Sequence, residues 1–378
     1  MKRIAFDIDV AGSCNLRCPS CPQGNAKNYR LPVGSMEPEL LAKIVRKAKS
    51  ECQLIGISLF SWTEPMLNPK LPELISIVQD SGVCCYISSN LNILRNPDAI
   101  MAGNPASFRI SASGFTQEVY GYSHRGGDIE KVKRHMVELA KAKQRNKSAT
   151  RIHVRYHRYK HNLKEESLMR EFAVSLGFDF QPVWAWMLPL EKILSYVDGD
   201  ESIFPLTDED YQLISNLALP LAGALETLRK KEYPTCSLRD GQISMNFHGD
   251  VQLCNVVFND KKFTIGNYLD LSLAEIQRAR QSHNMCSRCM QLGGHAYLTC
   301  GSNELTGIAM TNLSLKDVDL LDLRYELAQK RLRKKLEKVY NKVFARIITT
   351  EQKVMVGALF DRMQRRVGQA KRSLRGKG

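Results

Sequence analysis

Three cysteines near the N-terminus have the types and spacing that hold an iron–sulfur cluster. Cys14, Cys18 and Cys21 lie within the segment CNLRCPSC. A [4Fe-4S] cluster has four irons and normally takes four thiolates, so a loop with three thiolates holds the cluster and leaves one iron open to a small molecule. The alternatives are a zinc site or three unrelated thiols. Zinc usually takes four nitrogen or sulfur ligands, and the next cysteine, Cys52, lies far along the chain.

Four further cysteines form a second group in the C-terminal half. Cys236 and Cys254 lie on either side of the segment FHGDV, residues 247–251, which predicts a strand, a tight turn and a returning strand. Such a hairpin brings Cys236 and Cys254 to one end, and Cys286 and Cys289 add a CxxC pair. Four thiolates close an iron–sulfur cluster and leave no open iron. A zinc ribbon uses the same ligand set and is the alternative here.

Short apolar strands alternate with amphipathic helical segments through about residue 190, which predicts a parallel α/β fold. The predicted strands are residues 4–10, 54–60, 83–88, 107–112, 151–156 and 179–184, with helices such as 38–49 and 71–80 between them. The first cysteine group directly follows the first strand. It therefore lies at the carboxyl end of that strand, where α/β barrels carry their active sites.

The Cx3Cx2C loop after a first strand resembles the radical S-adenosylmethionine (radical SAM) enzymes, in which the open iron binds the amino and carboxylate groups of SAM. The resemblance implies an α/β fold, a partial (β/α)6 TIM-type barrel over residues 1–190 that is open on one side. The second cysteine group resembles the SPASM and Twitch domains of these enzymes, over residues 234–303. Because Cys300 is the only cysteine after the four, the resemblance implies one auxiliary [4Fe-4S] cluster. A helical linker, 191–233, and a basic helical tail, 313–378, complete the expected organisation.

The resemblance also implies SAM contacts at the ends of successive strands. After the second strand the family usually has Gly-Gly-Glu-Pro, and this chain has WTEP at residues 62–65. Glu64 would therefore meet the SAM amino group, whereas the two glycines, which allow conformations closed to Trp and Thr, are missing. The following strand ends supply the remaining candidates, Ser88, Asn90, Ser111 and Arg125. The alternative is a solvated strand-end carboxylate for Glu64, an ordinary turn for Ser88 and Asn90, and a helix-flanking surface charge for Arg125.

The predicted strand 151–156 and the residues after it are rich in polar side chains, among them His153, Arg155 and His157. A strand buried on both faces in a barrel is mostly apolar, so these residues indicate a lined cavity. Alternate residues of a strand face opposite sides. The sequence does not say which set faces inward, and Arg155 and Tyr156 are competing candidates for the pocket.

The composition is typical of an unexported enzyme that uses its cysteines for metal or redox chemistry. The chain has 378 residues, 43% of them hydrophobic, which is enough for a full catalytic domain with smaller units. No apolar run reaches the ~18 residues that span a bilayer, and Asp7 and Asp9 interrupt any N-terminal signal peptide. We therefore expect a cytoplasmic protein, in which the 11 cysteines serve metal binding rather than disulfides.

Most of the net charge of +15 comes from the C-terminal tail. Residues 321–378 hold 17 of the 54 Lys and Arg but only 5 of the 39 Asp and Glu, so the catalytic body is close to neutral. Apolar residues recur in the tail at three- and four-residue spacing, which predicts an amphipathic helix with a basic face. Such a helix can dock on the enzyme, bind an acidic partner or contact an anionic membrane surface. In the last case the protein would be peripheral to the membrane. Nucleic acid is the least favoured partner, because no nucleic-acid module is recognisable.

By the resemblance, the chain is expected to cleave SAM reductively to a 5'-deoxyadenosyl radical that abstracts hydrogen from a substrate carbon. A reducing partner such as flavodoxin or ferredoxin would supply the electron, and no catalytic acid or base is assigned. Because the chain begins directly at the first predicted strand, without a leader-binding domain before it, we expect a small-molecule substrate such as a sugar, which is oxidised or otherwise modified. A peptide-modifying enzyme is the first alternative. The second is a non-catalytic iron–sulfur or zinc protein that binds a partner through its basic tail.

Overall fold

The computed structural model describes residues 1–25, 33–199, 204–231, 233–258, 260–299 and 303–313, and residues 1–316 form one compact unit. Within it lies a nine-stranded sheet in the order β6-β5-β4-β3-β2-β1-β7-β8-β9. Its parallel part consists of β1 (Arg3–Ile8), β2 (Gln53–Ser58), β3 (Cys85–Ser89), β4 (Ser107–Ser111), β5 (Arg151–Arg158) and β6 (Asp179–Trp184). All six predicted strands are present close to their predicted bounds, so the predicted α/β fold with a parallel sheet is confirmed.

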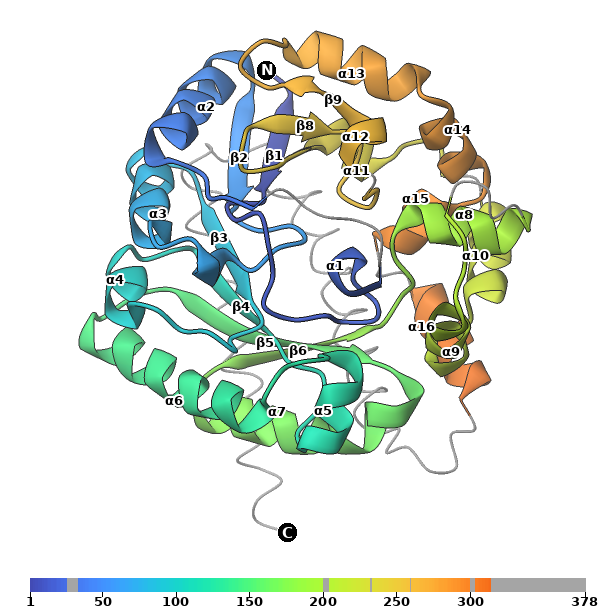
Figure 1. Cartoon of the computed structure of the whole chain (residues 1–378), viewed down its shortest axis with the longest axis horizontal. Helices are drawn as coiled ribbons and strands as arrows, with labels where there is room; N and C mark the ends of the chain where they lie inside the picture. The colour runs from blue at the N-terminus through green and yellow to red at the C-terminus, as the bar shows by residue number, and fades with distance from the viewer. Residues whose placement is uncertain (26–32, 200–203, 232, 259, 300–302, 314–378) are drawn as a thin grey trace, which may run out of the picture. The chain divides into compact units, whose positions relative to one another are not determined.

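The helices between these strands cover the outer face of the curved sheet (Figure 1). They are α2 (Pro38–Glu51), α3 (Leu71–Asp80), α4 (Pro97–Ala102), α5 (Gln117–Ser123), α6 (Ile129–Arg145) and α7 (Glu166–Ser175), with the short 3-10 helices η1 (Pro65–Leu67) and η2 (Lys160–Glu165). The four-residue helix α1 (Pro22–Asn25) follows the first cysteine group. Since β6 and β9 are the two edges of the sheet, the barrel is not closed, as a partial TIM-type barrel requires.

The inner face of the barrel sheet is polar, and its outer face belongs to the core. In β5 the side chains of Val154 and Tyr156 are fully buried in the apolar core that the strands and the covering helices share. The side chains of His153 and Arg155 are partly exposed. The charge of Arg155 also acts on Arg109 of β4, so both guanidinium groups lie on the inner face. Of the two competing candidates, Arg155 therefore lines the barrel interior and Tyr156 belongs to the core.

The predicted hairpin of the second cysteine group is present and extends the barrel sheet. It consists of β7 (Gln242–Met245) and β8 (Asp250–Gln252), which pair antiparallel, and β9 (Thr264–Asn267) pairs with β8. Gly249 in the turn has a φ of +83°, a conformation that favours glycine. β7 pairs parallel with β1, which the sequence analysis did not anticipate. The hairpin is therefore continuous with the barrel sheet.

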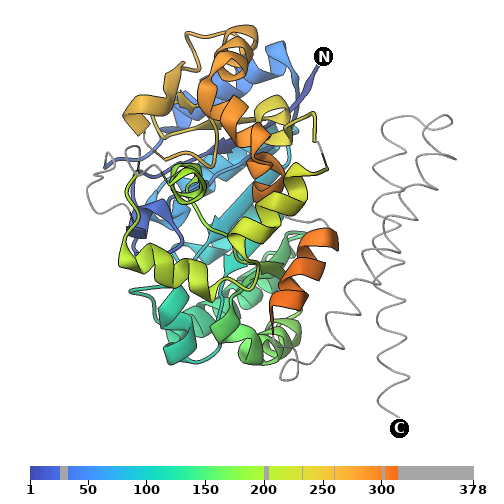
Figure 2. The same cartoon turned by 90° about the vertical axis from the view of Figure 1, so that its right-hand side faces the viewer.

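The remaining helices lie on the side between the two sheet edges and around the hairpin (Figures 1 and 2). They are α8 (Leu190–Asp198), α9 (Asp208–Asn216), α10 (Leu221–Arg229), α11 (Ser237–Gly241), α12 (Asp260–Phe263), α13 (Leu273–Ser282), α14 (Asn284–Gln291), α15 (Gly294–Leu298) and α16 (Asn303–Asn312). α10, in the predicted linker, packs against α15 and α16, so the linker is helical and packed on its neighbours.

Two sequence predictions lie outside the described residues. These are the role of Cys300 and the helical nature of the basic tail from residue 314 onward. Among the residues that the structure does describe, no helix is long and apolar enough to cross a membrane.

Candidate functional site

The first cysteine group lies on the loop between β1 and α1. The Leu16 N–H donates to Cys14 Sγ at 3.5 Å, and the Cys21 N–H donates to the Cys18 carbonyl at 3.0 Å. A Cβ on Gly24 would lie 2.2 Å from that carbonyl oxygen, so only glycine fits where α1 packs back on the loop. The path of the loop therefore depends on a residue outside the cysteine motif.

The three thiols of this loop lie close enough to influence one another. Burial raises the pKa of Cys14 to about 11, and burial together with the Cys14 thiolate raises the pKa of Cys18 to about 12. Burial and both other thiolates raise the pKa of Cys21 as well. Bound iron would remove this repulsion, because a metal cation stabilises the thiolate form of its ligands. The three clustered thiols thus fit the predicted open cluster.

Glu64 and Asn90, two of the residues predicted to contact SAM, lie beside the cysteine loop. The Asn90 amide Nδ2 lies 3.6 Å from Cys14 Sγ and donates to Asn15 Oδ1 at 3.0 Å. The Asn90 N–H donates to Glu64 Oε2 at 2.8 Å, and the Met66 N–H donates to Glu64 Oε1 at 3.1 Å. Glu64 is 2% exposed, and burial raises its pKa to about 7. A buried carboxylate of this kind is suited to an ammonium group as its partner.

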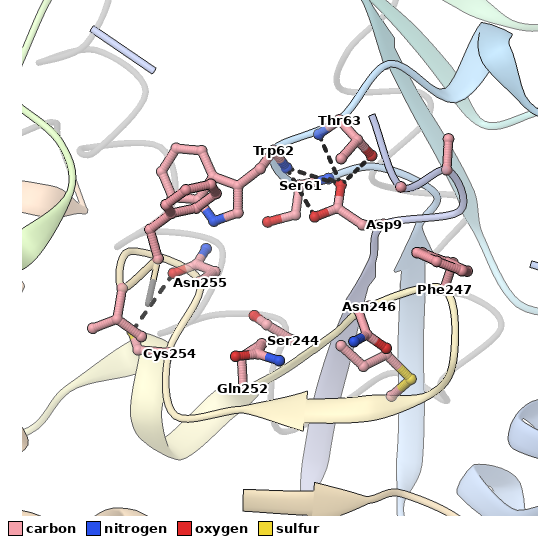
Figure 3. Close-up of a pocket in the computed structure, with 15 residues that line it drawn as sticks. Asp9, Ser61, Trp62, Thr63, Ser244, Asn246, Phe247, Gln252, Cys254 and Asn255 are labelled. Atoms are coloured by element: carbon pink, nitrogen blue, oxygen red, sulfur yellow. Dashed lines mark hydrogen bonds between the residues drawn. The ribbon is translucent and has the colours of Figure 1, made fainter. Parts of the chain in front are cut away.

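Asp9 determines the path of the loop that precedes Glu64. Its carboxylate accepts hydrogen bonds from the N–H groups of Ser61, Trp62 and Thr63, each at 2.9 Å, and from the Thr63 hydroxyl at 2.6 Å (Figure 3). Burial raises the pKa of Asp9, and these hydrogen bonds act in the opposite direction. This carboxylate therefore orders a loop that lacks the family's two glycines. Sequence reasoning missed this role, although an acid directly after the first strand was a signal for it.

The other three predicted SAM contacts lie on the inner face or at its rim. Ser88 accepts a hydrogen bond from Arg109 Nε at 2.9 Å, and Ser111 pairs in register with Arg155. Within the described part of the chain, neither serine forms a hydrogen bond with the cysteine loop. The Arg125 carbonyl accepts the Arg17 N–H of that loop at 2.9 Å, and the Arg125 charge opposes the rise in the pKa of Cys18. Of the five candidates, Glu64, Asn90 and Arg125 thus lie beside the cysteine loop.

A charged cluster inside the barrel was only partly visible in the sequence. The Arg109 guanidinium lies 4.5 Å from the centre of the Phe60 ring, and burial lowers its pKa to about 9. Burial raises the pKa of Asp7 to about 6, with Arg109 acting against that rise. Burial, followed by the charge of Arg109, lowers the pKa of His153 to about 4. The inner face therefore carries the Arg109 and Arg155 cations, the Asp7 carboxyl group and the His153 imidazole, whose lowered pKa favours its neutral form.

All four cysteines of the second group line one cavity of about 420 Å³, together with mostly apolar side chains. Cys236 caps α11 and accepts the Arg239 N–H at 3.4 Å, Cys254 follows β8, and Cys286 and Cys289 lie on α14. Burial raises the pKa of Cys254 to about 12, and the Cys236 and Cys286 thiolates contribute to that rise. The structure thus brings together the four thiols that the sequence predicted as one ligand set.

The spacing of these groups bears on the choice between zinc and an iron–sulfur cluster. Among the described residues, no three His, Cys, Asp or Glu side chains lie close enough to hold a single metal ion. Zinc binds each thiolate at about 2.3 Å, so the sulfurs around it lie in near contact. No preformed site for a single ion is therefore present among the described residues, and a set of four thiolates suits either zinc or a [4Fe-4S] cluster.

A second cavity of about 520 Å³ lies between the loop held by Asp9 and the β7–β8 hairpin (Figure 3). The Trp62 and Phe258 rings meet edge to face there, with centroids 6.2 Å apart. The described lining has no Lys or Arg, and its polar groups include the amide side chains Asn246, Gln252 and Asn255. The buried Ser244 hydroxyl on its wall has no hydrogen-bond partner in the structure.

This second cavity is adjacent to both cysteine groups. Cys254 lines it and also lines the four-cysteine cavity. Cys21 Sγ of the first group lies 4.0 Å from the carbonyl oxygen of Trp62, another lining residue. A molecule in this cavity would therefore lie near a cysteine of each group.

Comparison with known proteins supports the predicted family resemblance. Residues 8–165 match the family model described as the Radical SAM superfamily. A cofactor-modifying protein for the tungsten-containing aldehyde ferredoxin oxidoreductase of Pyrococcus furiosus is 23% identical over 294 residues, which cover 71% of this chain and 79% of that protein.

Solved structures with the same fold include Streptococcus suis SuiB bound to S-adenosylmethionine. It has 13% identity and a TM-score of 0.50, over 77% of this chain and 72% of SuiB. SuiB bound to its precursor peptide SuiA has 13% identity and a TM-score of 0.51, over 76% and 66% of the two chains. The expected resemblance and the partial barrel are thereby confirmed.

Proposed function

We propose that this chain, in which residues 8–165 match the Radical SAM superfamily model, cleaves SAM reductively and oxidises or otherwise modifies a small, uncharged polar molecule such as a sugar. When bound, the cluster and SAM would supply a 5'-deoxyadenosyl radical that takes a hydrogen atom from a substrate carbon. The electron for this step would come from a reducing partner such as flavodoxin or ferredoxin.

The convergence of Glu64 and Asn90 on Cys14 carries the proposal. The three thiolates of the loop would hold the cluster, and the open iron would face the groups that bind SAM. Glu64 would take the SAM ammonium group, since a buried carboxylate with a raised pKa gains most from a cationic partner. Asn90 orients Glu64 through its backbone N–H and orders the cysteine loop through its side chain. Arg125, whose carbonyl accepts the Arg17 N–H, would offer a cation beside the cysteine loop for the SAM carboxylate.

The cavity between the two cysteine groups is the proposed substrate site. Aromatic edges from Trp62 and Phe258 beside amide side chains suit a molecule with both hydroxyl groups and C–H faces. The lack of Lys and Arg in the described lining argues against a phosphate or carboxylate group at this point. The position beside Cys254 would let the auxiliary cluster accept an electron from the substrate radical, and the loss of a proton would then complete a two-electron oxidation.

A peptide substrate is the second candidate. SuiB, which has the same fold, has been solved with its precursor peptide, and amide side chains such as Asn246 and Asn255 can also bind a peptide backbone. The cavity volume of about 520 Å³ has room for only part of a peptide. A peptide would therefore have to bind largely outside this cavity.

Anaerobic reconstitution tests the proposal. The full chain, loaded with iron and sulfide and reduced with dithionite, should hold about eight irons and convert SAM to 5'-deoxyadenosine. A Cys14→Ala, Cys18→Ala, Cys21→Ala variant should hold about four irons and release none of this product. The matched control is Cys84→Ala, because Cys84 is an exposed free thiol outside both groups. If the loaded wild-type chain leaves SAM intact, the non-catalytic alternative is correct.

A further inference from the structure

Arg280 is a buried cation at the wall of the four-cysteine cavity. It lies on α13 and is only 1% exposed. Its Nη1 donates to the carbonyl oxygens of Arg239, at 3.2 Å, and Gln242, and its Nη2 donates to the carbonyl oxygen of Gln252 at 3.2 Å. Its Nε is buried and has no hydrogen-bond partner. The guanidinium is thus held by neutral backbone groups alone.

These carbonyl groups fix the guanidinium next to the cysteines. Arg239 is three residues after Cys236, and its N–H donates to Cys236 Sγ at 3.4 Å. Gln252 is two residues before Cys254. α13 also packs against α11 and against α14, which carries the other two cysteines of the group. Three elements that supply the thiols therefore surround Arg280.

The charge of Arg280 has no protein anion in direct contact. Among the described residues, no carboxylate forms an ion pair or a hydrogen bond with it, and the nearby Asp240 pairs with Arg239 at 2.8 Å. A buried charge is costly unless an opposite charge compensates it. The groups that favour the charged form of Arg280 are led by Cys254, Cys286 and Cys236 as thiolates. Compensation of the Arg280 charge thus depends on whether these cysteines are thiolates.

We propose that Arg280 is the charge partner of the auxiliary cluster and raises its reduction potential. This inference rests on the proposed function, which assigns a [4Fe-4S] cluster to these four thiolates. Four thiolates make the centre anionic, and its reduction adds one electron and one further negative charge. A fixed cation stabilises the more negative state more strongly. Arg280 thereby makes the cluster a better acceptor for the electron that the substrate radical must lose.

The test isolates the auxiliary cluster in the full chain by the Cys14→Ala, Cys18→Ala, Cys21→Ala substitutions. On this background Arg280→Gln removes the charge, Arg280→Lys keeps it, and Arg278→Gln removes an exposed charge from the same helix as a control. A redox titration followed by electron paramagnetic resonance gives each midpoint potential. We expect Arg280→Gln to lower the midpoint potential by at least about 59 mV, which corresponds to a tenfold change in the equilibrium constant of a one-electron reduction. Arg280→Lys should shift it much less, and Arg278→Gln should leave it unchanged.

Each other outcome is decisive. Equal potentials for Arg280→Gln and the background chain would overturn the inference and leave the proposed cluster intact. If Arg280→Gln binds no iron, the Arg280→Lys variant distinguishes the two roles. Normal iron loading and a normal midpoint potential in Arg280→Lys support the charge role. If neither variant binds iron, the role of Arg280 is only to hold the backbone through its hydrogen bonds. A background chain that binds zinc and no iron overturns the auxiliary cluster itself. SAM cleavage by the wild-type chain is measured separately, so failure of the radical SAM proposal is distinguishable.

Discussion

The Asp9 carboxylate accepts hydrogen bonds from three consecutive N–H groups of the loop that leads to Glu64. Hydrogen bonds to an ionised group are stronger than those between neutral groups. A loop that lacks glycines can therefore keep one conformation and present Glu64 next to Cys14. The segment WTEP lacks the two glycines of the family pattern. Asp9, at the end of the neighbouring strand β1, compensates for their loss by ordering the loop.

Asp9→Asn tests this compensation. The variant keeps the shape of the side chain but loses the charge, so the loop should loosen and SAM affinity should fall by roughly tenfold or more. The iron content should stay at the wild-type value, because Asp9 is not a cluster ligand. Equilibrium SAM binding to the loaded protein measures the effect, with the exposed Glu37→Gln as a control. Unchanged SAM affinity in Asp9→Asn would refute the role of Asp9.

The cysteine loop and α1 depend on each other at the scale of elements. The loop turns back on itself, and α1 packs so closely on it that Gly24 has no room for a Cβ beside the Cys18 carbonyl. The thiols of the loop are held in this arrangement by backbone hydrogen bonds within it. Cluster binding is therefore expected to depend on close packing as well as on the three ligands.

Gly24→Ala should lower cluster loading without removing a ligand. The added methyl group collides with backbone, which cannot move aside as a side chain can, so the loop should shift and the chain should keep about four irons instead of about eight. Gly223→Ala in α10 is the matched control, because its nearest neighbour lies 3.8 Å away. Iron analysis after reconstitution measures both. Full loading of Gly24→Ala would mean that the loop tolerates another path.

The pairing of β7 with β1 joins the second cysteine group to the barrel at the scale of the whole molecule. Ser244 of β7 lies in register with Asp7 of β1, so the hairpin forms one wall of the cavity that Asp9 also lines. The proposed substrate site therefore depends on this junction between the hairpin and the barrel. The compact unit ends at residue 316.

Two truncations test this organisation. Removal of residues 317–378 should leave iron loading and SAM cleavage near wild-type values, because the compact unit is retained. Removal of residues 234–378 should give an aggregating chain, since it exposes the β1 edge that β7 covers. Size-exclusion chromatography and iron analysis compare the two. A monomeric, iron-loaded chain of residues 1–233 would show that the barrel is independent of the hairpin.

Local pattern in the sequence was enough for the six strands, the hairpin and the membership of both cysteine groups. Strand periodicity and cysteine spacing depend on residues a few positions apart, and these relations hold wherever the segment lies in the fold. The sequence did not determine which residues of β5 face inward, because the alternation of side chains is the same for both faces. Only the core that Tyr156 joins settled it.

Only the tertiary structure decided three further features. These are the contacts of Asp9 with residues 61–63, the pairing of β7 with β1 and the position of Arg280. Each joins segments far apart in the chain, and which residues meet depends on sheet register and helix packing. The sequence by itself determined that this protein carries three thiolates on one loop and four in a second group. How a carboxylate, a cation and a cavity are arranged around them follows from long-range packing, which spacing along the chain does not encode.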